Sequence, residues 1–193
     1  MKSEEQGRAK RLDANALRGL AHPLRVRILE ILRSDGPSTA TRLAKLLGED
    51  SGNVSWHLRQ LGEHGFAAED VDRGTRRERW WVALHDYTAV DTDAFLDDTD
   101  LQGLLAILKN EVLQQQFRRA AGFLAQDWPS EWNEAAGMGY WKLRLNPTEL
   151  TALRDELLGL LDRYDALCQD TARQDTSSEV VFQFQAFPRK NER

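Results

Sequence analysis

The feature that most constrains this chain is the segment 51–61, with the sequence SGNVSWHLRQL. Val54, Leu58 and Leu61 recur at the spacing of one helical stripe, so the segment predicts a helix with a single narrow buried face. Its other side chains are hydrogen-bonding groups, a cation and a flat ring, without a carboxylate: Asn53, Ser55, Trp56, His57, Arg59 and Gln60. Base edges in the DNA major groove carry a readable pattern of donors and acceptors. We therefore interpret residues 51–61 as a recognition helix.

The residues before this helix predict the rest of a helix-turn-helix motif. Leucine spacing indicates a helix over 38–47, which Ser38 or Thr39 would cap, and we expect Ser51 to cap the recognition helix. Gly48 lies in the short turn between them, and two short helices joined by a glycine-bearing turn form this motif. Apolar spacing predicts two further helices upstream, over 12–20 and 23–33.

A β-hairpin is predicted after the recognition helix. A turn at 72–75 separates two segments, and the second favours a strand because it contains Trp80, Trp81 and Val82. Four arginines lie around the tip, namely Arg73, Arg76, Arg77 and Arg79. The candidate DNA contacts in the wing are Arg73, Thr75, Arg76 and Arg77. Arginines on a thin ribbon can reach phosphates or a minor groove. The hairpin therefore reads as the wing of a winged helix-turn-helix domain.

The charge of the chain is unevenly distributed. Residues 1–84 hold 15 Lys and Arg against 12 Asp and Glu, a net of +3, whereas residues 85–193 hold 11 against 19, a net of −8. DNA binding depends on local charge, because only the surface that meets the phosphates needs to be basic. The total of −5 is therefore compatible with a basic DNA-binding half and an acidic half kept away from DNA.

Other sequence features bear on location and chemistry. The single cysteine, Cys168, excludes an intrachain disulfide and fits a reducing cytoplasm. No apolar run approaches the ~20 residues of a membrane span, and the polar start of the chain does not resemble a signal peptide. No enzyme motif is present, and four His and one Cys lack metal-ligand spacing. We expect a cytoplasmic chain that is not an enzyme, without a metal, a cofactor or a membrane partner.

The C-terminal half is predicted to be a dimerisation or sensor region with α/β content and long helices. Helices are expected over 101–124 and 149–168, and alternation favours strands over 140–145 and 180–187. The whole chain would then be mainly α with small β. The expected organisation is a disordered tail at 1–11, a winged helix-turn-helix domain at 12–84, an acidic linker at 85–100 and the C-terminal region at 101–193.

Two features of the C-terminal half suggest roles in regulation. We assign the helix 101–124 to a dimer interface, together with the helix 12–20. An aromatic group could form the walls of a pocket for an apolar or planar effector: Trp128, Trp132, Tyr140 and Trp141. The alternative is that these side chains simply fill the core of a small α/β subdomain.

Three runs closely resemble ArsR-type winged helix-turn-helix regulators. They are LRGLAHPLRVRILEIL at 17–32, STATRLAKLLGEDSGNVSWHLRQLGEHGFAAE at 38–69 and RGTRRERWWV at 73–82. The resemblance covers residues 12–84, under half of the chain. It implies a homodimer whose recognition helices enter successive major grooves, with Asn53, Ser55, Trp56 and His57 facing DNA, Arg59 toward phosphate or base, and Arg73, Arg76 and Arg77 in the wing.

One departure from that family is informative. Its metal-sensing members carry a cysteine motif before the recognition helix, or His and carboxylate ligands on a C-terminal helix. Here the helix 38–47 has no Cys, and the helix 101–124 has neither His nor Cys. The chain therefore resembles the extended, non-metal-sensing branch of this bacterial family.

The sequence leaves three hypotheses. In the first, the chain is a transcription regulator, expected to be a repressor, that binds double-stranded DNA as a homodimer on a pseudo-palindromic operator and responds to a small apolar or aromatic effector. In the second, the C-terminal half is a dimerisation and protein-docking module without a ligand. In the third, the chain mainly meets proteins and the helix-turn-helix is a vestigial scaffold.

Overall fold

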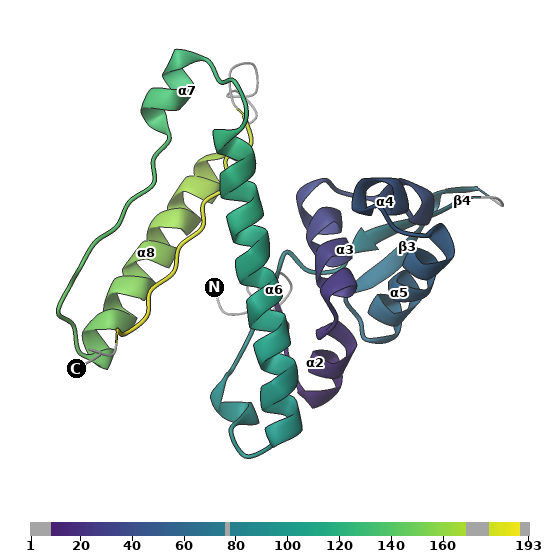
Figure 1. Ribbon diagram of the computed structural model, residues 1–193, viewed down its shortest axis with the longest axis horizontal. Helices are drawn as coiled ribbons and strands as arrows, with labels where there is room; N and C mark the ends of the chain where they lie inside the picture. Colours follow the sequence, from purple (N-terminus) through teal and green to yellow (C-terminus); the bar gives the residue numbers. More distant parts are fainter. Residues whose placement is uncertain (1–8, 76–77, 169–177, 190–193) are drawn as a thin grey trace. The chain divides into compact units, whose positions relative to one another are not determined.

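The computed structural model describes residues 9–75, 78–168 and 178–189 (Figure 1). The chain divides into two compact units, Met1–Gln126 and Asp127–Arg193. It is mainly helical with a small amount of sheet, as the sequence predicts. In the part of the chain so described, we find no helix with both the length and the apolar character that a bilayer crossing requires.

The predicted helix-turn-helix is present in the first unit. Its helices are α2 (Ala14–Leu20), α3 (Pro23–Ser34), α4 (Ala40–Leu47) and α5 (Ser51–Glu63). Each begins at a side chain that accepts hydrogen bonds from first-turn amides, namely Asp13, His22, Thr39 and Asp50. The expectation that Ser51 caps α5 is wrong by one residue. Gly48 joins α4 to α5 in the left-handed region, at φ 68°.

The wing is also present, as an antiparallel sheet in the order β2-β4-β3. Its strands are β2 (Ser38–Thr39), β3 (Ala67–Thr75) and β4 (Glu78–Ala83). Trp81 is buried, and its ring lies so close to Gly62 of α5 that a Cβ there would meet it at 3.2 Å. The sheet is therefore anchored to α5 through its central strand, β4.

A second, two-stranded sheet involves the start of the described chain. Strand β1 (Ala9–Arg11) pairs in parallel with β5 (Tyr87–Ala89). The expected disordered tail is therefore wrong for residues 9–11, because backbone pairing with a distant segment orders them. Residues 1–8 lie outside the described part of the chain.

The long helix α6 (Thr99–Leu124) belongs to the same unit as the wing (Figure 1). It packs on α2 and α3, burying Leu101, Leu105 and Leu108, and follows the short 3-10 helix η1 (Asp93–Phe95), whose Phe95 is also buried. Residues 85–100, expected to be a linker, thus include a strand and a core residue. The apolar face of α2, expected at a dimer interface, is covered by α6 of its own chain.

The second unit contains α7 (Ser130–Ala135) and α8 (Pro147–Cys168), and the latter matches the helix predicted at 149–168. The strands predicted at 140–145 and 180–187 are wrong: both segments run extended beside α8, and neither is paired as a strand (Figure 1). Alternating apolar residues indicate an extended segment with one apolar side, but a strand also needs a neighbour that satisfies its backbone hydrogen bonds.

Candidate nucleic-acid interface

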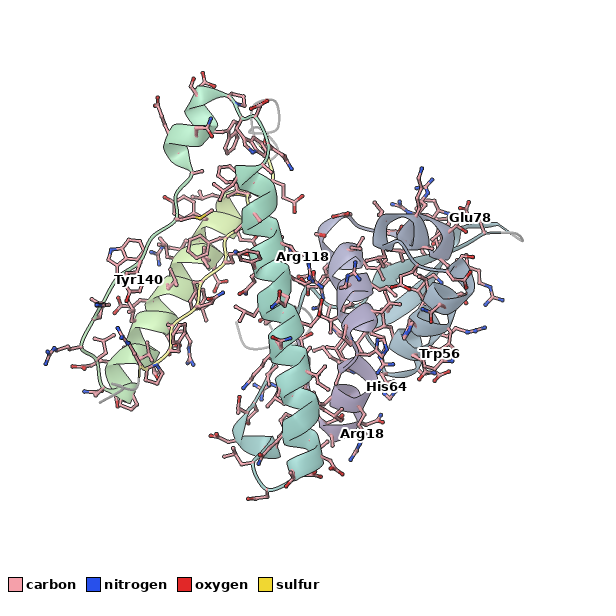
Figure 2. All side chains as sticks on the ribbon, in the orientation of Figure 1. Arg18, Trp56, His64, Glu78, Arg118 and Tyr140 are labelled. Atoms are coloured by element: carbon pink, nitrogen blue, oxygen red, sulfur yellow. The ribbon has the colours of Figure 1, made fainter. Side chains whose placement is uncertain are left out.

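The outer face of α5 carries most of the side chains predicted to contact DNA. Val54, Leu58 and Leu61 are completely buried against the core. On the opposite side, Asn53 and Arg59 are exposed, Trp56 is 47% exposed, and Ser55 and Gln60 are half-buried. Figure 2 shows Trp56 on the outer side of the unit. The helix thus offers an amide, an indole and a guanidinium on one surface.

Neighbouring carboxylates hold two of these groups in place. The Asn53 Nδ2 donates to Glu49 Oε2 at 3.4 Å, and the Gln60 Nε2 donates to Glu63 Oε2 at 2.7 Å. Both hydrogen bonds are exposed to solvent. Exchanging an exposed hydrogen bond for one to a base edge costs little, because water already competes for the same donor. The amides of Asn53 and Gln60 are therefore oriented yet available.

The structure corrects the placement of His57. Its side chain is only 3% exposed, with ring centroids 4.5 Å from His22 and 4.7 Å from Trp56, so it is buried and does not belong to the exposed face of α5. The reason is helical geometry. Position 57 lies three residues after Val54 and four before Leu61, which places it on the same buried face.

The environment of His57 favours its neutral form. Its Nδ1 has no hydrogen-bond partner among the described residues, and His22 beside it uses its own Nδ1 to accept from the Leu24 amide at 3.1 Å. Burial, together with His22 and the buried Arg25, lowers the pKa of His57 to about 4, although Glu49 acts in the opposite direction. Burial and Arg25 also lower the pKa of His22.

Acid is therefore expected to destabilise the first unit. A histidine whose pKa is lower in the folded chain than its unfolded value of 6.5 binds fewer protons when folded. The contribution of His57 to the free energy of unfolding is fully present above pH 6.5 and is lost as the pH falls toward about 4. We expect the free energy of unfolding to fall by about 2–3 kcal/mol from this residue between neutral pH and pH ~4. Urea denaturation followed by circular dichroism at several pH values measures this loss.

The matched variant for this prediction is His57→Leu, which keeps a side chain of similar size and removes the titration. Since Nδ1 of His57 makes no hydrogen bond within the described chain, the substitution should cost little stability at neutral pH. The variant should lose clearly less stability on acidification than the wild type. Identical pH profiles for the two proteins would show that another group controls the acid transition.

The wing arginines within the described chain are paired with wing carboxylates. Arg73 Nε lies 3.2 Å from Asp70 Oδ2, and Arg79 Nη1 lies 2.9 Å from Glu69 Oε1. Both arginine side chains are more than half exposed, so these pairs are weak and a phosphate can replace the carboxylate. The predicted contacts Arg76 and Arg77, and the side chain of Thr75, lie outside the described residues.

A further cation, which the sequence did not single out, lies between α4 and the sheet. The guanidinium carbon of Arg42 is 4.5 Å from the centroid of the Trp80 ring. Arg42 is exposed, and Trp80 is half-buried. No local sequence signal reveals this contact, because the two residues are distant in the chain.

The predicted effector pocket is not formed by the described residues of the second unit. Tyr140 and Trp141 are 77% and 79% exposed, Trp128 is 37% exposed, and Trp132 is half-buried. Figure 2 labels Tyr140 on the extended segment beside α8. A shallow hollow along α8, lined by Leu153, Leu157 and Leu160 among others, includes none of the four aromatic residues. These side chains are near one another in sequence without enclosing a cavity.

Comparison with known proteins identifies the domain type. Residues 20–70 match the sequence model of a family described as a helix-turn-helix domain. This match spans α3, α4, α5 and the start of β3. No curated protein matches the chain at a significant level.

Solved structures show only a low likeness to the whole chain. The structure of Rv0081 from M. tuberculosis is 24% identical, with a TM-score of 0.33, over 55% of this chain and 91% of that one. A mutant of ZitR from Lactococcus lactis in apo form is 13% identical, with a TM-score of 0.33, over 75% and 83%. The transcriptional regulator Tm0710 from Thermotoga maritima is 14% identical, with a TM-score of 0.31, over 75% and 79%. Likenesses of this size decide nothing about function.

Proposed function

We propose that this winged helix-turn-helix transcription regulator is an ArsR-like, cytoplasmic, homodimeric repressor that reads a pseudo-palindromic operator. The observation that carries the proposal is the outer face of α5, where Asn53, Trp56 and Arg59 are exposed while the opposite stripe is buried in the core. Helices of this kind place their N-terminal residues against base edges in the major groove. Occupying an operator hinders transcription without any further activity, which favours repression.

The wing and the distribution of charge support a DNA partner. Arg73 and Arg79 are exposed on the wing, where phosphates of the adjoining backbone can displace Asp70 and Glu69. Residues 1–84 carry a net charge of +3, although the whole chain is acidic. The acidic C-terminal half would be repelled by DNA, which favours approach through the helix-turn-helix domain.

The long helix α6 supports the homodimer, because it has a second apolar stripe. Opposite the buried Leu101, Leu105 and Leu108, exposed apolar side chains continue along the helix. Five apolar residues and the polar Asn110 follow one another in alternating steps of four and three residues, the spacing of a coiled-coil seam: Ala106, Asn110, Leu113, Phe117, the half-buried Ala120 and Leu124. Leu113 is 49% exposed, and Phe117 and Leu124 are each 69% exposed. A second copy would cover this stripe and place two recognition helices on one operator.

The second unit carries the dimerisation or docking part of the proposal. The four aromatic residues do not enclose a pocket within the described chain, which weighs against the small apolar or aromatic effector. Exposed apolar side chains along α8, such as Leu158 and Tyr164, favour the alternative of a dimerisation or docking module. We therefore favour docking over effector binding for this unit.

Footprinting on the DNA upstream of the chain's own gene tests the proposed function. The wild type should protect two stretches about one helical turn apart, with an affinity that falls steeply as salt rises. The Phe117→Asp variant should sediment as a monomer and protect both stretches only at higher protein concentration, because it places a charge in the exposed stripe of α6.

The control for this experiment is Leu96→Asp, which introduces the same charge at a side chain that is 55% exposed but lies outside the α6 stripe. It should sediment and protect like the wild type. If no stretch of DNA is protected and the affinity for DNA depends only weakly on salt, the proposal of a DNA-binding regulator is overturned. If the wild type binds the DNA as a monomer, only the homodimer part of the proposal is overturned.

A further inference from the structure

We infer that Arg42, stacked on Trp80, binds a DNA phosphate and fixes the orientation of the domain on the duplex. This inference rests on the proposed function, since it names a contact within the same interface. The geometry is a guanidinium carbon 4.5 Å from the centroid of the Trp80 ring, on an exposed arginine in the first turn of α4.

Apart from its contact with Trp80, the charge of Arg42 has no partner among the described residues. A cation in the first turn of a helix opposes the helix dipole, so this position does not stabilise α4. Arg42 makes no ion pair within the described chain, whereas Arg73 and Arg79 on the wing are paired with carboxylates. Within the part of the chain that the structure describes, no carboxylate pairs with Arg42, so its charge is available to an anion.

Stacking on tryptophan prepares the guanidinium for a phosphate. The guanidinium carbon lies over the indole ring in a cation–π contact, and no guanidinium N–H of Arg42 donates a hydrogen bond within the described chain, so these donors are available. Those donors match the paired oxygens of a phosphate. Because the ring already restricts the long side chain, less conformational entropy is lost when the phosphate binds.

The location of the pair fits a backbone contact rather than base readout. Helix α4 begins directly after β2, and Thr39 of β2 is paired with Trp80 of β4. Arg42 thus joins the first helix of the helix-turn-helix to the wing. The first helix of such motifs crosses the DNA backbone while the second enters the groove. A phosphate contact fixes the register of the protein but carries no sequence information.

The test uses the full chain and the operator defined by footprinting, with a scrambled duplex of equal length beside it. Arg42→Ala should weaken binding to both duplexes by about fivefold to tenfold and reduce the slope of log K against log salt by about 1. Arg42→Lys and Trp80→Leu keep the charge, so each should bind more weakly than the wild type with an unchanged slope. Lys109→Ala, an exposed cation on α6, should change neither quantity.

The outcomes separate this inference from the proposed function. If the wild type protects no specific site, the proposed function fails. If the wild type binds its operator and Arg42→Ala retains the same affinity and slope, the phosphate contact is overturned while the regulator stands. If Arg42→Lys binds as tightly as the wild type, the charge alone acts and the role of the Trp80 stack is overturned.

Discussion

Replacing Gly19 with alanine is expected to lower the free energy of unfolding by about 3 kcal/mol. A Cβ added to Gly19 of α2 would lie 2.6 Å from the Cβ of His64, and closer still to its ring atoms Cγ and Cδ2. Gly19 is buried, and His64 is the residue at which α5 ends. Neither helix can move away freely, because both are packed in the same core. The close approach of α2 to α5 therefore requires glycine at this position.

Urea denaturation monitored by circular dichroism measures this effect. The control is Gly103→Ala on α6, where no atom lies within 4 Å of an added Cβ, and helix propensity should stabilise the protein by up to about 1 kcal/mol. A Gly19→Ala, His64→Gly double variant should recover part of the loss, since it removes the colliding side chain. If Gly19→Ala has the same midpoint of urea unfolding as the wild type, the close packing of α2 against the end of α5 is contradicted.

The helix-turn-helix could be predicted from sequence because its signals are local. Leucines at helical spacing define the buried faces of α4 and α5, and Gly48 marks the left-handed turn between them. The burial of His57 was not predicted from the sequence. The buried face of α5 was defined only by its aliphatic residues, and the face that the core covers is wider than they indicate. A neutral histidine can lie within such a face when a second histidine packs against it.

Non-local features could not be predicted from the sequence. The stacking of Arg42 on Trp80 depends on the pairing of β2 with β4, and the need for glycine at position 19 depends on where α5 ends. Alternation at 140–145 and 180–187 indicated extended chain correctly but could not show whether a neighbouring strand would pair with it. Proximity of Trp128 to Trp141 in sequence likewise did not bring them into a common cavity.

The second large effect concerns the outer face of α5. Asn53→Ala and Arg59→Ala should each weaken operator binding by about tenfold to a hundredfold, because each removes donors suited to a base edge or a phosphate. Both side chains are exposed, so neither variant should change the unfolding transition by more than about 0.5 kcal/mol. The His57→Leu variant should bind with wild-type affinity at neutral pH, since the native side chain is buried.

Titration of one labelled operator fragment with these variants, by fluorescence anisotropy at a fixed salt concentration and pH 7.5, tests most directly that the exposed face of α5 reads DNA. We predict that Asn53→Ala and Arg59→Ala lose at least tenfold in affinity, whereas His57→Leu stays within about twofold of the wild type. Full affinity in Asn53→Ala and Arg59→Ala, with a large loss in a folded His57→Leu, would contradict this assignment of the recognition surface.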